Sequence, residues 1–284
     1  MDFKRIEQIF LLAFLGLNMF LFSIYHDGLA SESSVGNLNQ TEGIEKRLEN
    51  DNIKYGDSLS TKIYEGYYLS GEETNLQQAV EQERKDSGNK NFLKENTTYK
   101  AGVLTNFPKE NYFLKEEEMR EGVNTFLTSN ALLYGKEYSY LGHFSSLDGE
   151  YPEVVATQSF EEIPFNDETA RLTLTLEPAD NLWKITKYTQ THIGHIERLR
   201  EKQELYTERD AIRTLYVNNR IPADSEIKWT QLAYARIYKV REKNVYVPVW
   251  FVAIASNGNN SQIEHVNAIN NTIITNNTVQ RVDD

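Results

Sequence analysis

A stretch near the N-terminus contains no charged side chain between Glu7 and Asp27. A helix rises about 1.5 Å per residue, so this interval is just long enough to cross a hydrocarbon core of about 30 Å. Lys4 and Arg5 precede the stretch, and Glu32 follows it. Because basic residues favour the inner side, the sequence predicts a single-pass protein of the cell membrane with a cytoplasmic N-terminus and an extracellular C-terminal domain.

The alternative is a cleaved signal peptide, because Gly28-Leu29-Ala30 is a small-x-small triplet that could precede a cleavage site. The apolar run is longer than the roughly 7 to 15 residues of a usual signal-peptide core, which favours an anchor. Small polar residues without periodicity follow it and indicate a linker. The N-terminal part is therefore predicted as a cytoplasmic tail at 1–7, a transmembrane helix at 8–26 and a linker at 27–40.

The net charge of the chain is −12, and it contains no cysteine. An acidic surface repels polyanions, so binding to nucleic acid or anionic lipid is disfavoured. The lack of cysteine excludes thiol catalysis and every cysteine-based metal site. We therefore expect the partners to be proteins or neutral molecules.

Two segments of similar pattern follow the linker. In the first, Met119, Val123 and Phe126 share one helical face, and strands with alternating apolar residues come next. In the second, Thr207 and Asp210 form a capping-box pattern that opens a helix, again followed by strands. The sequence predicts an α+β fold of two similar helix-plus-antiparallel-sheet modules, with one continuous sheet as the alternative. The predicted parts are an N-terminal extracellular part at 41–97, a first module at 98–192, and a connecting helix at 193–206 with a second module to 284.

The sequence contains no nucleophile elbow, no phosphate-binding glycine loop and no zinc-protease motif. His192 and His195 are the only close pair of histidines, and we interpret them as a strand end with two partly exposed rings, because no third ligand accompanies them. His143 and His265 are expected to be polar or pH-sensitive surface groups. No catalytic residue, cofactor site or metal site is predicted, and the chain is expected not to be an enzyme.

The apolar strand at 246–254 carries Pro248, which predicts a bulge or a sheet edge there. Trp250 and Phe251 are expected in the core, and the alternative is that they border a docking surface.

The apolar run also contains a polar side chain, Asn18, near its middle. Leu11, Leu15, Asn18 and Phe22 follow the spacing of a helix–helix seam, and an interhelical hydrogen bond there is worth roughly 0.6 to 2 kcal/mol. These four residues are the predicted transmembrane partner contact. The alternative is that Asn18 bonds its own backbone or a nearby water.

Several segments of the chain resemble a known family. Asp2-Phe3-Lys4-Arg5 and the run from Ile9 to Leu21 are similar to the anchor of the YycI (WalI) regulatory proteins of Gram-positive bacteria. Val247-Pro248-Val249-Trp250 and the segment from Val266 to Ile274 strengthen this likeness, and they also resemble the end of PepSY-like modules. Asn271 stands where those modules have glycine, and asparagine also tolerates a positive φ.

This resemblance implies a non-enzymatic membrane protein that serves the YycFG (WalRK) two-component system. It implies two partners, a YycH-like paralogue and the sensor kinase YycG (WalK), which controls cell-wall homeostasis through a response regulator. It brings no catalytic residue and no cofactor. Two other functions remain open at this point, a membrane-anchored extracellular hydrolase, which converging carboxylates in a cleft would support, and a solute-binding sensor, which a deep apolar pocket would support.

Overall fold

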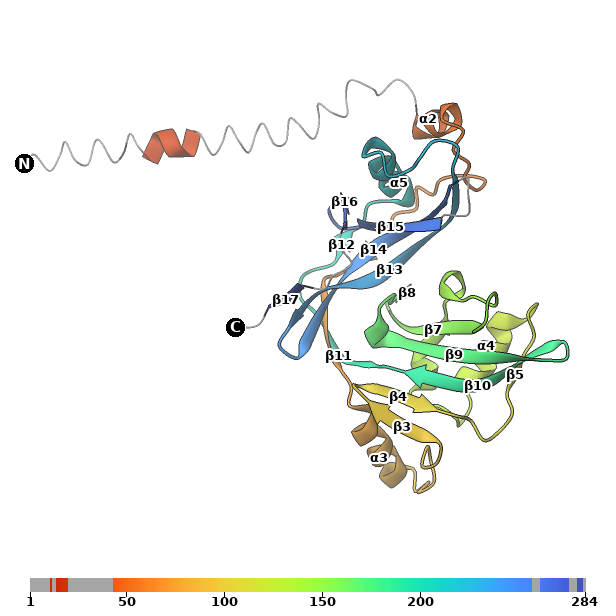
Figure 1. Cartoon of the computed structure of the whole chain (residues 1–284). Helices are drawn as coiled ribbons and strands as arrows, with labels where there is room; N and C mark the ends of the chain where they lie inside the picture. Colours follow the sequence, from red (N-terminus) through yellow and green to blue (C-terminus); the bar gives the residue numbers. More distant parts are fainter. Residues whose placement is uncertain (1–10, 12–13, 20–42, 257–260, 276–279, 283–284) are drawn as a thin grey trace, which may run out of the picture. The chain divides into compact units, whose positions relative to one another are not determined.

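The structure is a computed structural model that describes residues 11, 14–19, 43–256, 261–275 and 280–282 (Figure 1). The chain divides into a small unit, Met1–Asn52, and a large unit, Ile53–Asp284. In the small unit, α2 (Ile44–Asn50) buries Ile44 and Leu48. Most of the predicted membrane helix at 8–26 lies outside the described residues, and within the described residues no helix is long and apolar enough to cross a membrane.

The large unit contains two main sheets and a short two-stranded one, β1–β12. The first main sheet has eight strands in the order β3-β4-β10-β9-β7-β6, with β5 beside β10 and β8 beside β7, and all its pairs are antiparallel. Its strands are β3 (Thr97–Lys100), β4 (Val103–Asn106), β5 (Phe113–Leu114), β6 (Tyr138–Tyr140), β7 (Glu153–Phe160), β8 (Ile163–Pro164), β9 (Arg171–Ala179) and β10 (Leu182–Gln190).

The second main sheet has seven strands in the order β11-β2-β14-β13-β17, with β15 beside β14 and β16 beside β15. Only the pair of β13 with β17 is parallel. Its strands are β2 (Leu69–Glu73), β11 (Ile193–Arg198), β13 (Glu226–Val240), β14 (Lys243–Ala255), β15 (Ser261–Asn267), β16 (Thr272–Ile273) and β17 (Gln280–Val282); β1 is Glu65–Gly66 and β12 is Gln203–Glu204.

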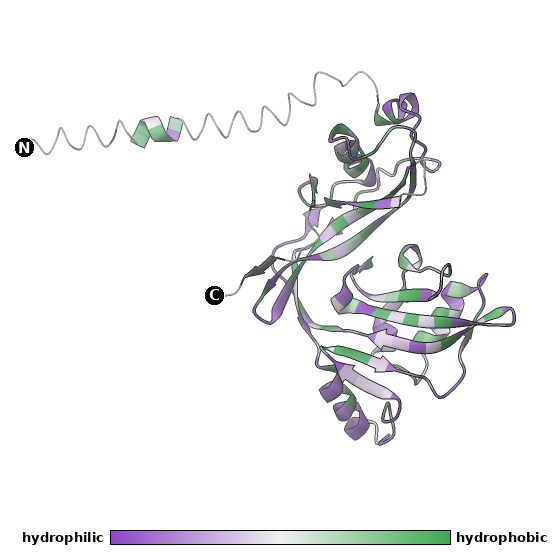
Figure 2. Cartoon of the chain, in the orientation of Figure 1, coloured by the Kyte–Doolittle hydropathy of each residue, from purple (hydrophilic) through white to green (hydrophobic). Residues whose placement is uncertain are grey.

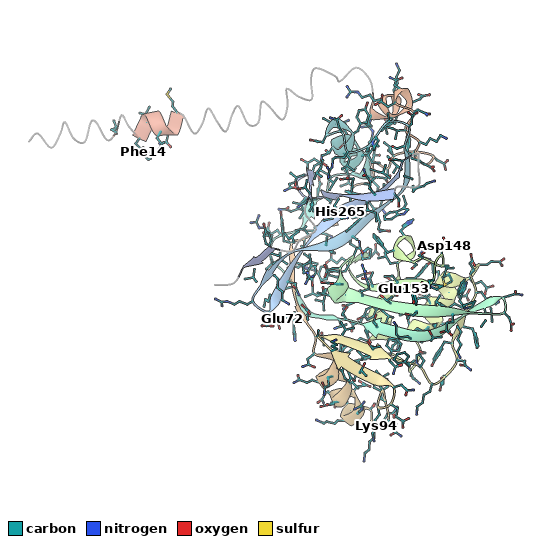
Figure 3. The ribbon with its side chains drawn as sticks, viewed as in Figure 1. Phe14, Glu72, Lys94, Asp148, Glu153 and His265 are labelled. Carbon is teal, nitrogen blue, oxygen red and sulfur yellow. The ribbon has the colours of Figure 1, made fainter. Side chains whose placement is uncertain are left out.

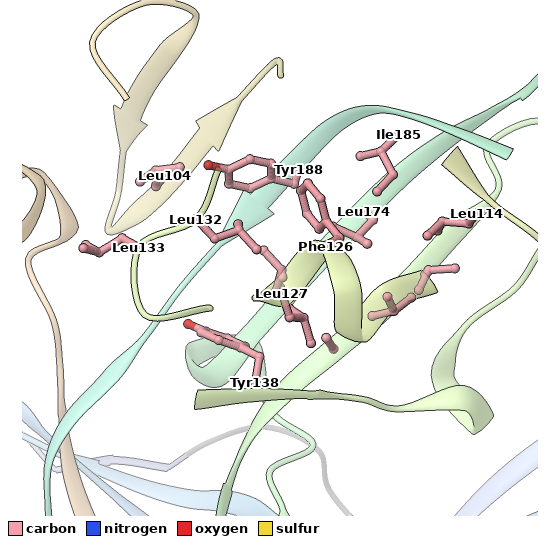
Figure 4. Close-up of a cluster of buried hydrophobic side chains, with 14 of the residues drawn as sticks. Leu104, Leu114, Phe126, Leu127, Leu132, Leu133, Tyr138, Leu174, Ile185 and Tyr188 are labelled. Carbon is pink, nitrogen blue, oxygen red and sulfur yellow. The ribbon is translucent and has the colours of Figure 1, made fainter. Parts of the chain in front are cut away.

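The core of the eight-stranded sheet forms under α4 (Met119–Leu127), whose apolar face is the one that the sequence predicts. Phe126 packs edge-on against Tyr188 of β10, with ring centroids 6.0 Å apart (Figure 4). On β9 the residues alternate, so Leu174 and its two neighbouring leucines point to α4, and Figure 2 shows this alternation along the strands. α3 (Leu76–Asp86) lies on the same side, because Leu76 and Val80 join this cluster.

The seven-stranded sheet has α5 (Glu208–Val217) on one face, where the helix contacts β14, β15 and β16. The predicted capping box is confirmed, since Thr207 accepts from the Asp210 backbone at 3.2 Å and Asp210 accepts from the Thr207 backbone at 3.2 Å. Trp250 and Phe251 are buried, as predicted. The indole nitrogen of Trp250 donates to the carbonyl of Tyr206 at 2.8 Å, which holds the entry to α5 against this sheet.

The prediction of a connecting helix at 193–206 is wrong. This segment forms β11 and β12, and β11 pairs with β2 so that Ile193 lies opposite Glu73. The Glu- and Arg-rich composition favours a helix only weakly, whereas the edge of β2 offers backbone partners and Ile193 packs closely over Gly71. Tertiary pairing therefore decides the structure of this segment.

The two sheets each combine antiparallel strands with a helix, but they do not follow the predicted sequence boundaries. β2 precedes the first predicted module in the chain, yet it lies between β11 and β14 in the seven-stranded sheet. The chain therefore passes from one sheet to the other at Thr74 and returns at Thr191–His192. The alternative of one continuous sheet is also wrong, because the sheets have separate strand orders.

Pro248 lies in neither of the places predicted for it. β14 is a central strand, and Pro248 pairs with Tyr234 of β13. On the other side β2 ends its pairing at Tyr246 and β15 begins at Val249, and the Pro248 carbonyl accepts from the Ala268 N–H at 2.9 Å. In an antiparallel strand the N–H and C=O groups of one residue point to the same side. The N–H that proline lacks would therefore point from Pro248 into the gap between β2 and β15, where no strand needs it as a donor.

Candidate functional site

A groove of about 1260 Å³ lies between the two main sheets of the large unit. One side belongs to the eight-stranded sheet and the loops that leave it, and the other to β13, β14 and β15. The groove mixes apolar and polar side chains, and its lining includes Phe144, Asn166, Asp167, Glu168, Arg171, Arg236, Ile237, Val249, Phe251, Ile263, His265, Asn267 and Ile274.

The floor of the groove is the face of the seven-stranded sheet opposite to α5. The ladder places Phe251 directly opposite His265 and Val249 opposite Asn267, so these four side chains share one face. The rings of Phe251 and His265 meet edge-on with centroids 4.7 Å apart. His265 is labelled on β15 in Figure 3. At the outer end of this floor Ile263 is 43% exposed, so an apolar contact surface continues to the rim.

The opposite wall comes from a short helical turn, η2 (Gly142–Phe144), that reaches across from the eight-stranded sheet. Phe144 packs edge-on against Phe251, with centroids 5.7 Å apart, and His143 stacks on Trp229 at 4.9 Å. Burial lowers the pKa of His143, because the charged ring would lose water there. His143 is exposed, as predicted for a surface group, although its ring stacks on Trp229, whereas His265 is half-buried against Phe251.

The charged groups of the groove form one cluster around Arg236 of β13. Arg236 Nη2 donates to Glu168 Oε1 at 2.6 Å, and Nε lies 3.4 Å from Asp167 Oδ2. Arg236 and Asp167 are only 11% and 12% exposed. Burial by itself would lower the pKa of Arg236, but the two carboxylates outweigh it and raise that pKa. The cluster joins β13 to the segment before β9 by charge as well as by packing.

This arrangement suits binding better than acid–base chemistry. The two carboxylates that line the groove, Asp167 and Glu168, are both engaged by Arg236. A glycosidase needs one carboxyl group that keeps its proton and another that stays ionised beside the substrate. An open groove with aromatic and aliphatic side chains between polar ones instead has the composition of a contact surface.

The two close histidines have separate environments. His192 is buried, with its Nδ1 2.7 Å from Thr74 Oγ1 and its Nε2 2.9 Å from Glu137 Oε2. His195 is exposed at a positive φ of 48°. His192 lies directly before β11, at a strand end as predicted, but its ring is buried, and His195 lies inside β11 rather than at its end. Within the described ranges, no three metal-binding side chains come together.

The predicted transmembrane contact is described only in part. Leu11 and Leu15 are exposed, and Phe22 lies outside the described residues. The amide of Asn18 donates to the carbonyl of Phe14 at 3.0 Å, which is the backbone bond named as the alternative to a seam. A partner amide could replace that bond, so the seam stays a prediction.

Several groove residues have no signal in the sequence. Asp167 and Glu168 are neighbours in the chain, but Arg236 follows Glu168 by 68 residues and meets the two carboxylates only through the strand pairing around β13. Phe144 belongs to no periodic pattern. The alternation of β14 could have placed Phe251 on one face and Trp250 on the other, but it could not reveal which face stays open.

The fold defines a mixed α/β protein of two mostly antiparallel sheets with few helices and a groove between the sheets. The family model described as YycI protein matches residues 31–269, and the chain belongs to this family. The family has a regulatory role in the YycFG system and is not known as enzymatic. The PepSY-like character of the C-terminal part stays a prediction.

Two further comparisons add little to this assignment. The chain is similar to an uncharacterized protein from Eubacterium rectale ATCC 33656, known from a crystal structure, with 11% sequence identity and a TM-score of 0.41. That match covers 79% of this chain and 91% of the other. No curated protein matches the sequence.

Proposed function

We propose that the chain is a membrane-anchored, extracytoplasmic accessory regulator of a YycG (WalK)-type sensor histidine kinase that controls cell-wall homeostasis. It acts through protein–protein contacts made by the anchor and the extracellular domain, together with a YycH-like paralogue. The match to the YycI family over residues 31–269 is the observation that carries this proposal. The uncharged stretch between Glu7 and Asp27 supports the anchor.

The groove between the sheets is the proposed contact surface of the extracellular domain. Its rim presents the exposed Ile263, next to an apolar floor that contains the buried Phe251. Apolar side chains that lose water in the centre of a contact are typical of protein interfaces. The carboxylates that a hydrolase would need are held by Arg236, and the groove lacks the deep apolar pocket expected of a solute sensor. Both observations favour a regulator over the two alternatives.

Purification of the tagged full chain from native membranes in mild detergent, followed by identification of bound proteins, tests the proposal. The sensor kinase and the paralogue should both be recovered. An Ile263→Arg variant should reduce their recovery, because a charge on the rim cannot enter an apolar contact. Val217→Arg is the matched control, since Val217 is 49% exposed on α5, away from the groove. If neither protein is recovered with the unchanged chain, the proposal is wrong.

A further inference from the structure

Among the described elements, no helix packs on one face of the eight-stranded sheet. α3 and α4 both pack on the side to which Leu174 points, and the alternation of β9 turns Thr173 and Thr175 to the other side. We call this second side the open face, made of the outward residues of β3, β4, β5, β9 and β10. A row of four threonines crosses it in register, Thr98–Thr105–Thr189–Thr173, because each is directly opposite the next.

Basic and aromatic side chains accompany the threonine row. Lys187 lies opposite Thr175, Lys100 lies opposite Val103, and Lys184 lies between Phe113 and Glu177. Phe113 is 47% exposed although it belongs to a strand.

The lysines of the open face are not neutralised by ion pairs. None of the ion pairs among the described residues contains Lys100, Lys184 or Lys187. The acids on this side are Glu177 and Glu153, the latter labelled in Figure 3. Arg171, at the start of β9, donates to Asn166 at 3.0 Å and lines the groove beside Asp167 and Glu168, so it adds no net positive charge to this face. The acids of α3 and α4 lie on the opposite side of the sheet, as Glu121 on α4 illustrates. The open face therefore carries three lysines against two acids, a small positive excess, although the chain carries a net charge of −12.

We propose that the open face docks on the surface of an anionic lipid bilayer. Lysine is depleted at protein–protein interfaces, whereas lysine combined with an exposed aromatic ring is typical of surfaces that lie in lipid headgroups. Threonine hydroxyls can donate to phosphate oxygens. Salt screens charges beyond about 8 Å, so acids on the far side of the sheet oppose this contact only weakly. The net charge alone would predict repulsion, and the distribution of charge reverses that expectation for this face.

This inference rests on the proposed membrane anchor. The anchor keeps the domain close to the bilayer, so the effective concentration of the domain at the lipid surface is high. Weak contacts are then sufficient for the open face to dock. Three lysines and one phenylalanine would not hold a free protein on a membrane, but they can orient a domain that is already tethered to it. The orientation would in turn decide which way the groove between the sheets faces.

The lack of cysteine in the chain allows a direct test. Full-length Thr98→Cys, at the exposed end of the threonine row and labelled with an environment-sensitive fluorophore, is reconstituted into vesicles of phosphatidylcholine alone or with 30% phosphatidylglycerol. The emission should shift to the blue in the anionic vesicles and return at 0.5 M salt. Gln82→Cys on exposed α3 is the control and should not respond. Lys184→Gln and Lys187→Gln should each lower the equilibrium constant for docking about fivefold, since one lysine near an anionic surface contributes about 1 kcal/mol.

Each outcome decides for or against the lipid contact. An equal signal in neutral and anionic vesicles, or an equal response at position 82, overturns it. A response that appears only when the sensor kinase is added also overturns it and assigns the face to a protein partner. Flotation of the vesicles with the chain is measured separately. A chain that does not float contradicts the anchor of the proposed function, whereas a chain that floats with a silent label contradicts only the docking.

Discussion

Replacing Arg236 with methionine tests whether the charge cluster holds β13 to the segment before β9. Methionine keeps much of the side-chain volume but removes all donors. The change separates Asp167 from its cation, while Glu168, which is 78% exposed, returns to water at little cost. Asp167 keeps two hydrogen bonds on its other oxygen, from the backbone of Thr169 at 3.0 Å and its hydroxyl at 2.6 Å. Only one oxygen of the buried carboxylate is left without a partner.

The expected loss follows from the burial of the pair. Breaking a buried ion pair by removing one partner costs about 3–5 kcal/mol, and the bonds from Thr169 place this case at the lower end, about 3 kcal/mol. Adding Asp167→Asn to Arg236→Met should recover much of it, because the uncompensated charge is gone. The matched control is Lys228→Met, which breaks the exposed pair with Glu226 and should cost less than about 1 kcal/mol.

The assay is chemical denaturation of the full chain in mild detergent, followed by tryptophan fluorescence. Trp229 and Trp250 report on the seven-stranded sheet, and Trp183 reports on the eight-stranded one. A loss in Arg236→Met no larger than in Lys228→Met would refute the reasoning, and so would a double variant that is no more stable than Arg236→Met alone. Either result would mean that the cluster is solvated and that packing alone joins the two sheets.

Three further predictions concern other parts of the chain. Burial lowers the pKa of His143, so the folded state takes up fewer protons than the unfolded state, and stability falls as the pH drops below about 6.5. His143→Phe should therefore flatten the dependence of the unfolding free energy on pH between about 7 and 5, and an unchanged slope contradicts this. Thr207→Ala should cost about 1 kcal/mol of unfolding free energy by removing the α5 cap, and a neutral result would mean that Asp210 suffices. Asn18→Leu should weaken co-purification with the sensor kinase without releasing the chain from membranes, whereas full recovery would favour the bond to Phe14.

The sequence predicts elements well where a local pattern is strong. The apolar spacing of Met119, Val123 and Phe126 defines α4, and the capping box at Thr207 marks the start of α5. Asn271 has a positive φ of 55°, as its position in the turn predicts. These features depend on residues only a few positions apart in the chain, so the sequence alone is sufficient to predict them.

Other features depend on contacts between distant segments. The helix predicted at 193–206 fails because the edge of β2, more than 100 residues earlier, pairs with it. The sequence predicts Pro248 at a bulge or a sheet edge because proline lacks an N–H group. It lies in a central strand instead, because the gap between β2 and β15, which the sequence does not reveal, leaves that position without a need for a donor. The groove is invisible in the sequence for the same reason, since Arg236 and Phe251 meet residues of the other sheet through topology rather than spacing.

We propose that the chain regulates the YycFG system through its sensor kinase. The most direct measurement is the phosphorylated fraction of the response regulator in native cells, compared between the unchanged strain, a deletion of this chain and a deletion complemented with the full chain. Deletion should change this fraction and the full chain should restore it, whereas complementation with the Ile263→Arg variant should restore it only in part. An equal phosphorylated fraction in all strains, with the chain confirmed in the membrane, would contradict the account.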